Sequence, residues 1–249
     1  MIPKFNWRRI GGVNIFELQG VFAEPWLHRN EEEMGNILTG HPSSGVLINL
    51  RELERIDRPG AEVILGTARK PHKGGILGQN LSTYFVAEHM NPNESIPIFE
   101  RESEAIRYFG KEFAEKDEAA EREKRKFPRV PTGLPVELDL KEEGGGLFSF
   151  EAVVLNLSEG GFFGRFLDTK TEELARRILD PYDLKMLKIR LKLADDEIVK
   201  TEGKVLRAEE ETAVPSGVAV EFYNLRTEDK QKIQAFLKAE GKGKTGRES

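Results

Sequence analysis

A run of charge in the middle of the chain limits most strongly how this sequence can fold. Residues 111–126 are almost entirely charged, with scattered alanines, and the two signs are interspersed. Such a run suits a solvated helix with ion pairs four residues apart, and it has too few apolar side chains to join a core. A chain of 249 residues is also long enough for two domains. We therefore predict a domain over residues 1–115, a charged helical linker over 116–124, a second domain over 125–240 and a disordered tail over 241–249.

Composition excludes several classes of function. The net charge is −5 at pH 7, whereas proteins that bind nucleic acid polymers usually carry a basic excess. The chain has no cysteine, which excludes disulfides and thiolate nucleophiles and fits a reducing compartment. The N-terminus lacks the apolar stretch of a signal peptide, and no segment approaches the roughly 18 apolar residues of a membrane-spanning helix. We expect a cytoplasmic protein that does not insert into membranes.

Catalytic and metal-binding patterns are missing from the sequence. The histidines do not stand at metal-ligand spacings, and they are His28, His41, His72 and His89. No phosphate-binding loop, nucleophile elbow or pair of catalytic carboxylates can be identified. The sequence predicts a protein that is not an enzyme and has neither metal nor cofactor.

The first domain alternates strand and helix patterns, which predicts an α/β layer domain. The strands are expected at residues 5–10, 13–20, 45–50, 81–87 and 95–99, and the helices at 24–38, from Pro59 to about 70, and 103–113. The first two strands are separated by Gly11 and Gly12 and should form a hairpin. The run at 45–50 is almost continuously apolar, as expected of a central strand that is buried on both faces.

This order resembles a STAS domain, the fold of anti-sigma-factor antagonists. The resemblance rests on residues 46–50, on the turn that reads Ile-Asp-Arg-Pro-Gly at 56–60, and on the later Ile98 to Ile106 segment. Phosphorylatable members of the family carry a serine at that turn, whereas Arg58 and Pro59 stand here, so switching by serine phosphorylation is not expected. The resemblance then implies a partner-binding role, with Asp57 and Arg58 as candidate contact residues. The alternative is that these two residues only begin a helix, where an acidic side chain is favoured.

The second domain has strand patterns without room for crossover helices. Strands are expected at residues 134–140, 148–155, 186–193, 199–207 and 217–222, followed by a helix over 227–239. Consecutive strands that lack crossovers pair in antiparallel fashion, and several of them can close into a small barrel. The predicted fold is therefore an α+β chain of two domains: an N-terminal α/β layer domain and a C-terminal antiparallel barrel with a terminal helix.

Two short motifs lie in this second domain in a fixed order. Arg125 and Arg129 form an RxxxR spacing, and Asn156, Ser158 and Gly161 fill a later [D/N]xSxxG pattern. Together these motifs resemble the PilZ domain. The resemblance implies that the domain binds cyclic di-GMP through Arg125, Arg129, Asn156, Ser158, Gly160 and Gly161, with Lys124 and Lys126 as further candidates for phosphate attraction.

The residue types suit such a ligand. The planar guanidinium of arginine can meet the O6 and N7 acceptors of guanine with two hydrogen bonds, and it can stack on a purine. Asn156 and Ser158 offer short polar side chains, while Gly160 and Gly161 permit positive φ and close approach to the backbone. The alternative is that the arginines are solvated linker charges and that the later motif is an ordinary β-turn.

The two resemblances together predict a signalling adaptor. Cyclic di-GMP bound at the barrel would be transmitted to the STAS-like domain, which would bind an unidentified protein partner. The alternative is a scaffold, or a protein that acts like an anti-sigma-factor antagonist, with a barrel that binds no nucleotide. A homodimer remains compatible with either interpretation.

Overall fold

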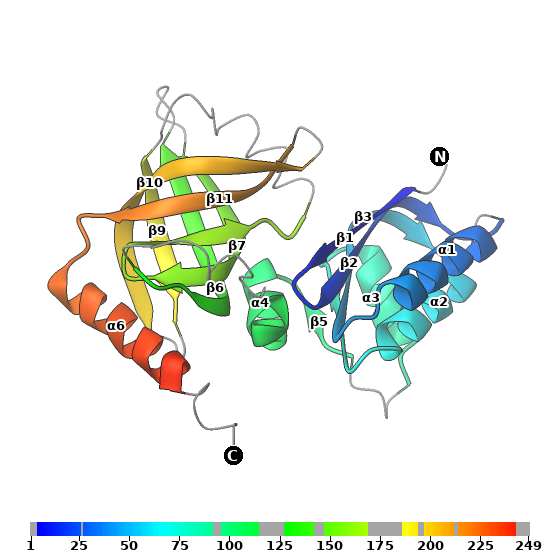
Figure 1. Cartoon of the computed structure of the whole chain (residues 1–249). Coiled ribbons are helices and arrows are strands. Elements are labelled where there is room, and N and C mark those ends of the chain that lie inside the picture. Colours follow the sequence, from blue (N-terminus) through cyan, green and yellow to red (C-terminus); the bar gives the residue numbers. More distant parts are fainter. Residues whose placement is uncertain are drawn as a thin grey trace, which may run out of the picture. The chain divides into compact units, whose positions relative to one another are not determined.

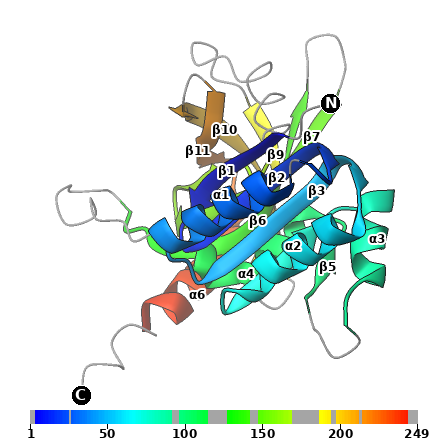
Figure 2. The same cartoon turned by 90° about the vertical axis from the view of Figure 1, so that its right-hand side faces the viewer.

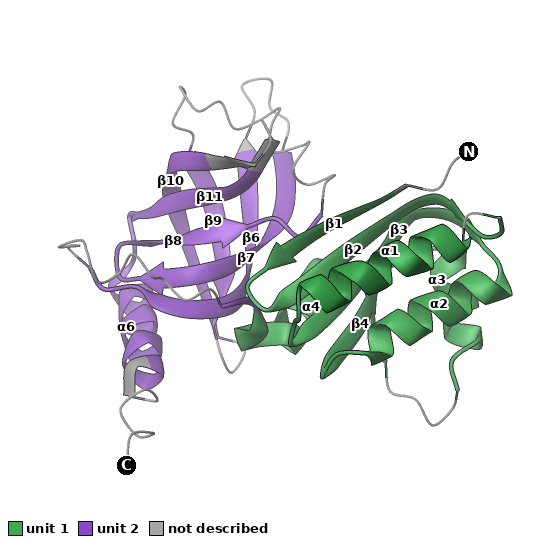
Figure 3. Ribbon diagram, turned by 45° about the vertical axis from the view of Figure 1, so that its right-hand side comes forward, with its two compact units in different colours: residues 1–112 green, residues 113–249 purple. Residues whose placement is uncertain are grey.

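The chain forms two compact units, residues 1–112 and residues 113–249 (Figure 3). The computed structural model describes residues 4–25, 27–91, 96–114, 127–141, 147–168, 186–193, 197–211 and 214–242. The predicted linker at 116–124 lies outside the described residues. Of the predicted disordered tail, Gly241 and Lys242 instead continue the terminal helix, and residues 243–249 lie outside the description.

The N-terminal unit is a five-stranded sheet with helices (Figure 1). Its elements are β1 (Lys4–Ile10), β2 (Val13–Phe22), α1 (Leu27–Gly40), β3 (Gly45–Ile56), α2 (Arg58–Arg69), β4 (Lys73–Leu77), α3 (Leu81–Glu88), β5 (Ile98–Phe99), α4 (Glu102–Phe109) and the 3-10 helix η1 (Gly110–Phe113). The strands lie in the order β1-β2-β3-β4-β5. β1 and β2 form the expected antiparallel hairpin, and each later strand is parallel to the one before it. The predicted α/β layer domain is confirmed.

The strand order places the helices. Because each crossover steps to the next strand in the same direction, right-handed connections put α1, α2 and α3 on one face of the sheet. Figure 2 shows α1 and α2 lying across the strands on that face. Val46 and Ile48 of β3 pack there with Met34 of α1 and Ile64 of α2, all fully buried. Phe109 of α4 covers the opposite face, where the sheet contains glycines.

One predicted strand is wrong, and one strand was not predicted. Residues 81–87 form helix α3 instead of a strand, and β4 occupies Lys73–Leu77, a segment with two glycines for which no strand was expected. Gly74 lies in β4 because the strand runs very close to α2: a Cβ added at Gly74 would lie 1.9 Å from the carbonyl oxygen of Ala68. The glycines therefore allow tight packing and do not mark a turn.

Asn80 explains why a helix begins at Leu81. Its Oδ1 accepts hydrogen bonds from the backbone N–H of Thr83 at 2.9 Å and from the hydroxyl of Thr83 at 2.7 Å, as an N-cap does. Its Nδ2 donates to the carbonyl oxygens of Leu50 at 2.6 Å and Leu53 at 2.9 Å. One amide thus starts α3 and binds it to the edge of β3 beyond the end of β4.

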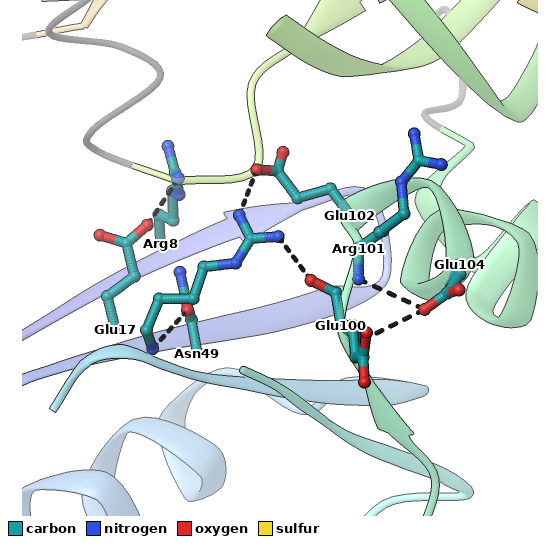
Figure 4. A network of polar contacts seen from close by, with 8 residues as sticks. Arg8, Glu17, Asn49, Glu100, Arg101, Glu102 and Glu104 are labelled. Carbon is teal, nitrogen blue, oxygen red and sulfur yellow. Dashed lines mark hydrogen bonds and ion pairs between the residues drawn. The ribbon is translucent and has the colours of Figure 1, made fainter. Parts of the chain in front are cut away.

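A network of charged groups joins α4 to β3 (Figure 4). The guanidinium of Arg51 donates to Glu102 Oε1 at 2.7 Å and to the carbonyl oxygen of Glu100 at 3.1 Å. The Glu102 side chain is only 6% exposed. A second ion pair, at 2.6 Å, links Arg8 to Glu17 across the β1–β2 hairpin. Removing one member of such a buried pair would leave an uncompensated buried charge, which is strongly destabilising.

The C-terminal unit is a closed antiparallel barrel with a terminal helix, as predicted. Its elements are β6 (Val130–Lys141), β7 (Leu147–Ser158), β8 (Gly161–Arg165), β9 (Met186–Lys192), β10 (Ile198–Glu211), β11 (Val214–Tyr223) and α6 (Thr227–Lys242). The strands follow one another around the barrel in the order β10-β11-β8-β7-β6-β9. β8 was not predicted, because its short run begins at Gly161, within the motif. Ile233 of α6 is fully buried in the barrel core, with Phe236 and Leu237 packed beside it.

Candidate functional site

The pairing of β6 with β7 brings the two predicted motifs together. Val130 lies opposite Leu157, and Pro131 lies opposite Asn156. Arg129 directly precedes Val130, so the end of the RxxxR segment enters the barrel beside Asn156 and Ser158. Residues far apart in the sequence therefore meet at one end of this strand pair.

Of the two predicted arginines, the structure describes Arg129. Arg129 is exposed, and its guanidinium forms no hydrogen bond or ion pair within the described part of the chain. The other predicted basic residues of this segment, Lys124, Arg125 and Lys126, lie outside the described residues. Arg129 is thus a cation close in the chain fold to the second motif. No described residue accepts a hydrogen bond from its guanidinium.

The second motif forms a tight turn between β7 and β8, residues 158–161, which we call the motif turn. Ser158 pairs with Gly161, and the buried Ser158 hydroxyl donates to the Gly161 carbonyl oxygen at 3.1 Å. The backbone N–H of Phe222 in β11 donates to the Gly160 carbonyl oxygen at 2.9 Å. These bonds fix the motif turn against the neighbouring strand. The Ser158 side chain therefore stabilises this turn.

The glycines of the motif turn are needed for two different close approaches. A Cβ on Gly161, whose φ is 157°, would lie 2.1 Å from the carbonyl oxygen of Val220. Gly160 does not have the positive φ that we expected to be useful there. Instead, a Cβ on Gly160 would lie 2.8 Å from the ring of Phe127. Phe127 stands between the two arginines of RxxxR, so this contact joins the arginine segment to the motif turn.

Asn156 carries an unused acceptor. Its Oδ1 is buried and has no hydrogen-bond partner among the residues that the structure describes. A buried polar atom without a partner is costly, by about 1 to 3 kcal/mol, and is rare in folded proteins. The position therefore suits a ligand or a water molecule that donates a hydrogen bond.

The geometry agrees with a family match over the same residues. Residues 123–239 match the family model of the PilZ domain. They form a PilZ domain. The match includes both motifs, all the strands of the barrel and most of helix α6, so the predicted identity of this half of the chain is confirmed.

Solved structures of low similarity include a PilZ domain and an anti-sigma factor antagonist. A PilZ domain with c-di-GMP of YcgR from Escherichia coli shares 13% identity, with 51% of this chain and 100% of that one covered and a TM-score of 0.37. An anti-sigma factor antagonist from Mycobacterium paratuberculosis shares 15% identity, with 42% of this chain and 92% of that one covered and a TM-score of 0.38. The Bacillus subtilis inhibitor of motility MotI/DgrA shares 17% identity, with 47% of this chain and 51% of that one covered and a TM-score of 0.35. The chain thus spans about half the length of that protein. These scores are too low to support an argument about function. No curated protein matches the chain.

Asp57 and Arg58, the candidate partner residues of the N-terminal unit, lie at the start of α2. Asp57 is the N-cap: its Oδ1 accepts from the backbone N–H of Gly60 at 2.8 Å, and its Oδ2 accepts from that of Glu24 at 3.3 Å. Arg58 is exposed and pairs with Glu62 at 3.1 Å. Asp57 therefore has the helix-start role, and Arg58 lies exposed beside it with an ion pair to Glu62.

Sequence reasoning missed three residues around the PilZ motifs. Phe127 had a recognisable signal, because it is a large apolar side chain between the charged residues of RxxxR. Glu159 and Gln234 had none: the Gln234 Nε2 donates to Glu159 Oε2 at 2.9 Å, a contact between residues of the motif turn and α6. Only the closed barrel with its helix reveals this pair.

Two further observations concern the described residues as a whole. They contain no group of three His, Asp or Glu side chains placed to hold a metal ion. None of their helices is both long and apolar enough to cross a membrane.

Proposed function

We propose that the PilZ domain binds cyclic di-GMP at the surface where RxxxR meets the motif turn. The observation that carries the proposal is the β6–β7 pairing. Pro131 lies opposite Asn156, whose buried Oδ1 is unsatisfied, and Arg129, whose guanidinium has no partner within the described structure, stands two residues before Pro131. A cation and a buried acceptor together suit a ligand that has phosphates and N–H donors. Cyclic di-GMP has both, and the PilZ family is the family of receptors for this nucleotide.

In this proposal the basic residues, Asn156 and the two glycines make different contributions to the ligand site. Arg125 and Arg129 bind phosphate or the O6 and N7 edge of guanine, since a guanidinium fork fits either group with two hydrogen bonds. Asn156 Oδ1 accepts from the N–H donors of a guanine. The backbone of Gly160 and Gly161 is fixed by hydrogen bonds and keeps the motif turn in place beside the ligand, while Lys124 and Lys126 add attraction for phosphate. Binding of this kind involves no chemical reaction and requires neither a metal nor a cofactor.

Calorimetric titration of the whole chain tests the proposal. We expect binding of cyclic di-GMP with a Kd in the micromolar range or tighter, about −8 kcal/mol, and no binding of GTP under the same conditions. GTP controls for general attraction between phosphate and lysine. The absence of both heat and thermal stabilisation with cyclic di-GMP would contradict the proposal and favour a scaffold that uses the PilZ fold without a ligand.

The N-terminal unit is proposed to receive the signal. Its STAS-like order of strands and helices and the exposed Arg58 at the start of α2 support a role in binding a partner protein. In this adaptor model nucleotide binding changes the population of arrangements of the two units, which a partner then distinguishes. We expect the small-angle scattering profile of the chain to change at saturating cyclic di-GMP. Superimposable profiles, with binding confirmed by calorimetry, would contradict a large rearrangement.

A further inference from the structure

The motif turn contains a carboxylate beside a surface proposed to bind an anion. Glu159 is the only acidic residue among residues 156–161. A carboxylate that turned toward bound phosphates would repel them, because like charges a few ångströms apart disfavour each other. The motif turn thus has a feature that works against the proposed ligand unless the side chain is directed elsewhere.

The structure directs this side chain toward α6. The amide Nε2 of Gln234 donates to Glu159 Oε2 at 2.9 Å, and the contact is partly buried. Gln234 follows Ile233, whose side chain is fully buried in the barrel core, so the amide is presented from a fixed helix. The carboxylate therefore accepts a hydrogen bond from a neutral donor on α6, the helix that packs against the barrel core.

We propose that Gln234 is a positioning residue for the nucleotide site, which holds the Glu159 carboxylate on the α6 side of the motif turn and away from the ligand phosphates. This inference rests on the proposed function. It gives α6 a part in setting nucleotide affinity, although no residue of α6 belongs to either motif. Displacement of α6 would release the carboxylate and weaken binding.

Four proteins test the proposal by calorimetry with cyclic di-GMP: the wild type, Gln234→Ala, Glu159→Gln and the double variant. We expect Gln234→Ala to raise the Kd about threefold to tenfold, because one freed charge acts on two phosphates through solvent. Glu159→Gln should bind at least as tightly as the wild type. In the double variant the loss should disappear, because no charge remains to be positioned. Raising the salt to about 0.5 M should reduce the loss in Gln234→Ala, since added salt screens exposed charges.

The matched control is Gln231→Ala, which makes the same change at an exposed position of α6 without a hydrogen bond from that side chain in the described structure. It should leave the Kd unchanged. If Gln234→Ala binds like the wild type, or if the double variant binds as weakly as Gln234→Ala, the positioning role is wrong; the second result would mean that the hydrogen bond only maintains the fold. If the wild type itself takes up no nucleotide, the proposed function fails and this inference fails with it.

Discussion

Replacing Arg129 with alanine is expected to weaken binding of cyclic di-GMP about a hundredfold, or about 2.7 kcal/mol. Arg129 is exposed and makes no hydrogen bond or ion pair within the described structure, so its donors are available to a ligand. Removing it takes away a charge-assisted contact to phosphate or guanine and leaves the ligand group unpaired. Calorimetric titration of the variant beside the wild type measures the change.

The stability of the barrel should not change in the same variant. Exposed side chains without partners contribute little to folding, usually within about 0.5 kcal/mol. The matched control is Arg226→Ala, which removes the same charge from another exposed position of the PilZ domain. Its Kd should stay within about twofold of the wild type, because Arg226 belongs to neither motif and an exposed charge is screened by salt. Equal affinities of Arg129→Ala and the wild type would mean that the ligand does not use this arginine.

The residues of the candidate site could be named from the sequence, but their arrangement could not. The two motifs were recognised as sequence patterns. Their meeting depends on the first residues of β6, and the expected strand began only at Leu134. Pro131 lacks a backbone N–H group, so local strand propensity is low at that position. The structure accommodates Pro131 through an irregularity in the register between Pro131 and Leu134, and this extension of β6 brings the backbone of Arg129 to the second motif.

The wrong strand in the N-terminal unit has a related cause. Residues 81–87 include Thr83, Tyr84, Phe85 and Val86, which favour strands locally. In the structure β4 and β5 are parallel neighbours, and such a pair requires a crossover, which α3 provides. The hydrogen bonds that Asn80 donates to the carbonyl oxygens of Leu50 and Leu53 join segments that are 30 and 27 residues apart in the sequence. Local propensity cannot contain that information, whereas the longer buried run at β3 was predicted because its signal is local.

Gly161→Ala is expected to have the largest effect on the PilZ domain, with a loss of roughly 4 kcal/mol in unfolding free energy and of nucleotide binding. The added Cβ would lie 2.1 Å from the carbonyl oxygen of Val220 and 3.0 Å from the Cα of Glu221. Both contacts are with backbone, so no side chain can rotate away to relieve them. The variant must separate β8 from β11 at the position where Gly161 pairs with Glu221. Because that pairing holds the motif turn, the surface for the nucleotide is lost with it.

Scanning calorimetry measures this effect, and Gly164→Ala in the same strand provides the matched control. A Cβ at Gly164 would approach the carbonyl oxygen of Val153 only to 3.3 Å, which a shift of a few tenths of an ångström can relieve. We expect the melting temperature of the barrel to fall by more than about 10 °C in Gly161→Ala and by only a few degrees in Gly164→Ala. A melting temperature of Gly161→Ala close to that of the wild type would contradict the close packing of β8 against β11. If that variant nevertheless lost nucleotide affinity, the requirement for glycine at this position of the motif would come from the ligand, which needs the space, and not from the barrel.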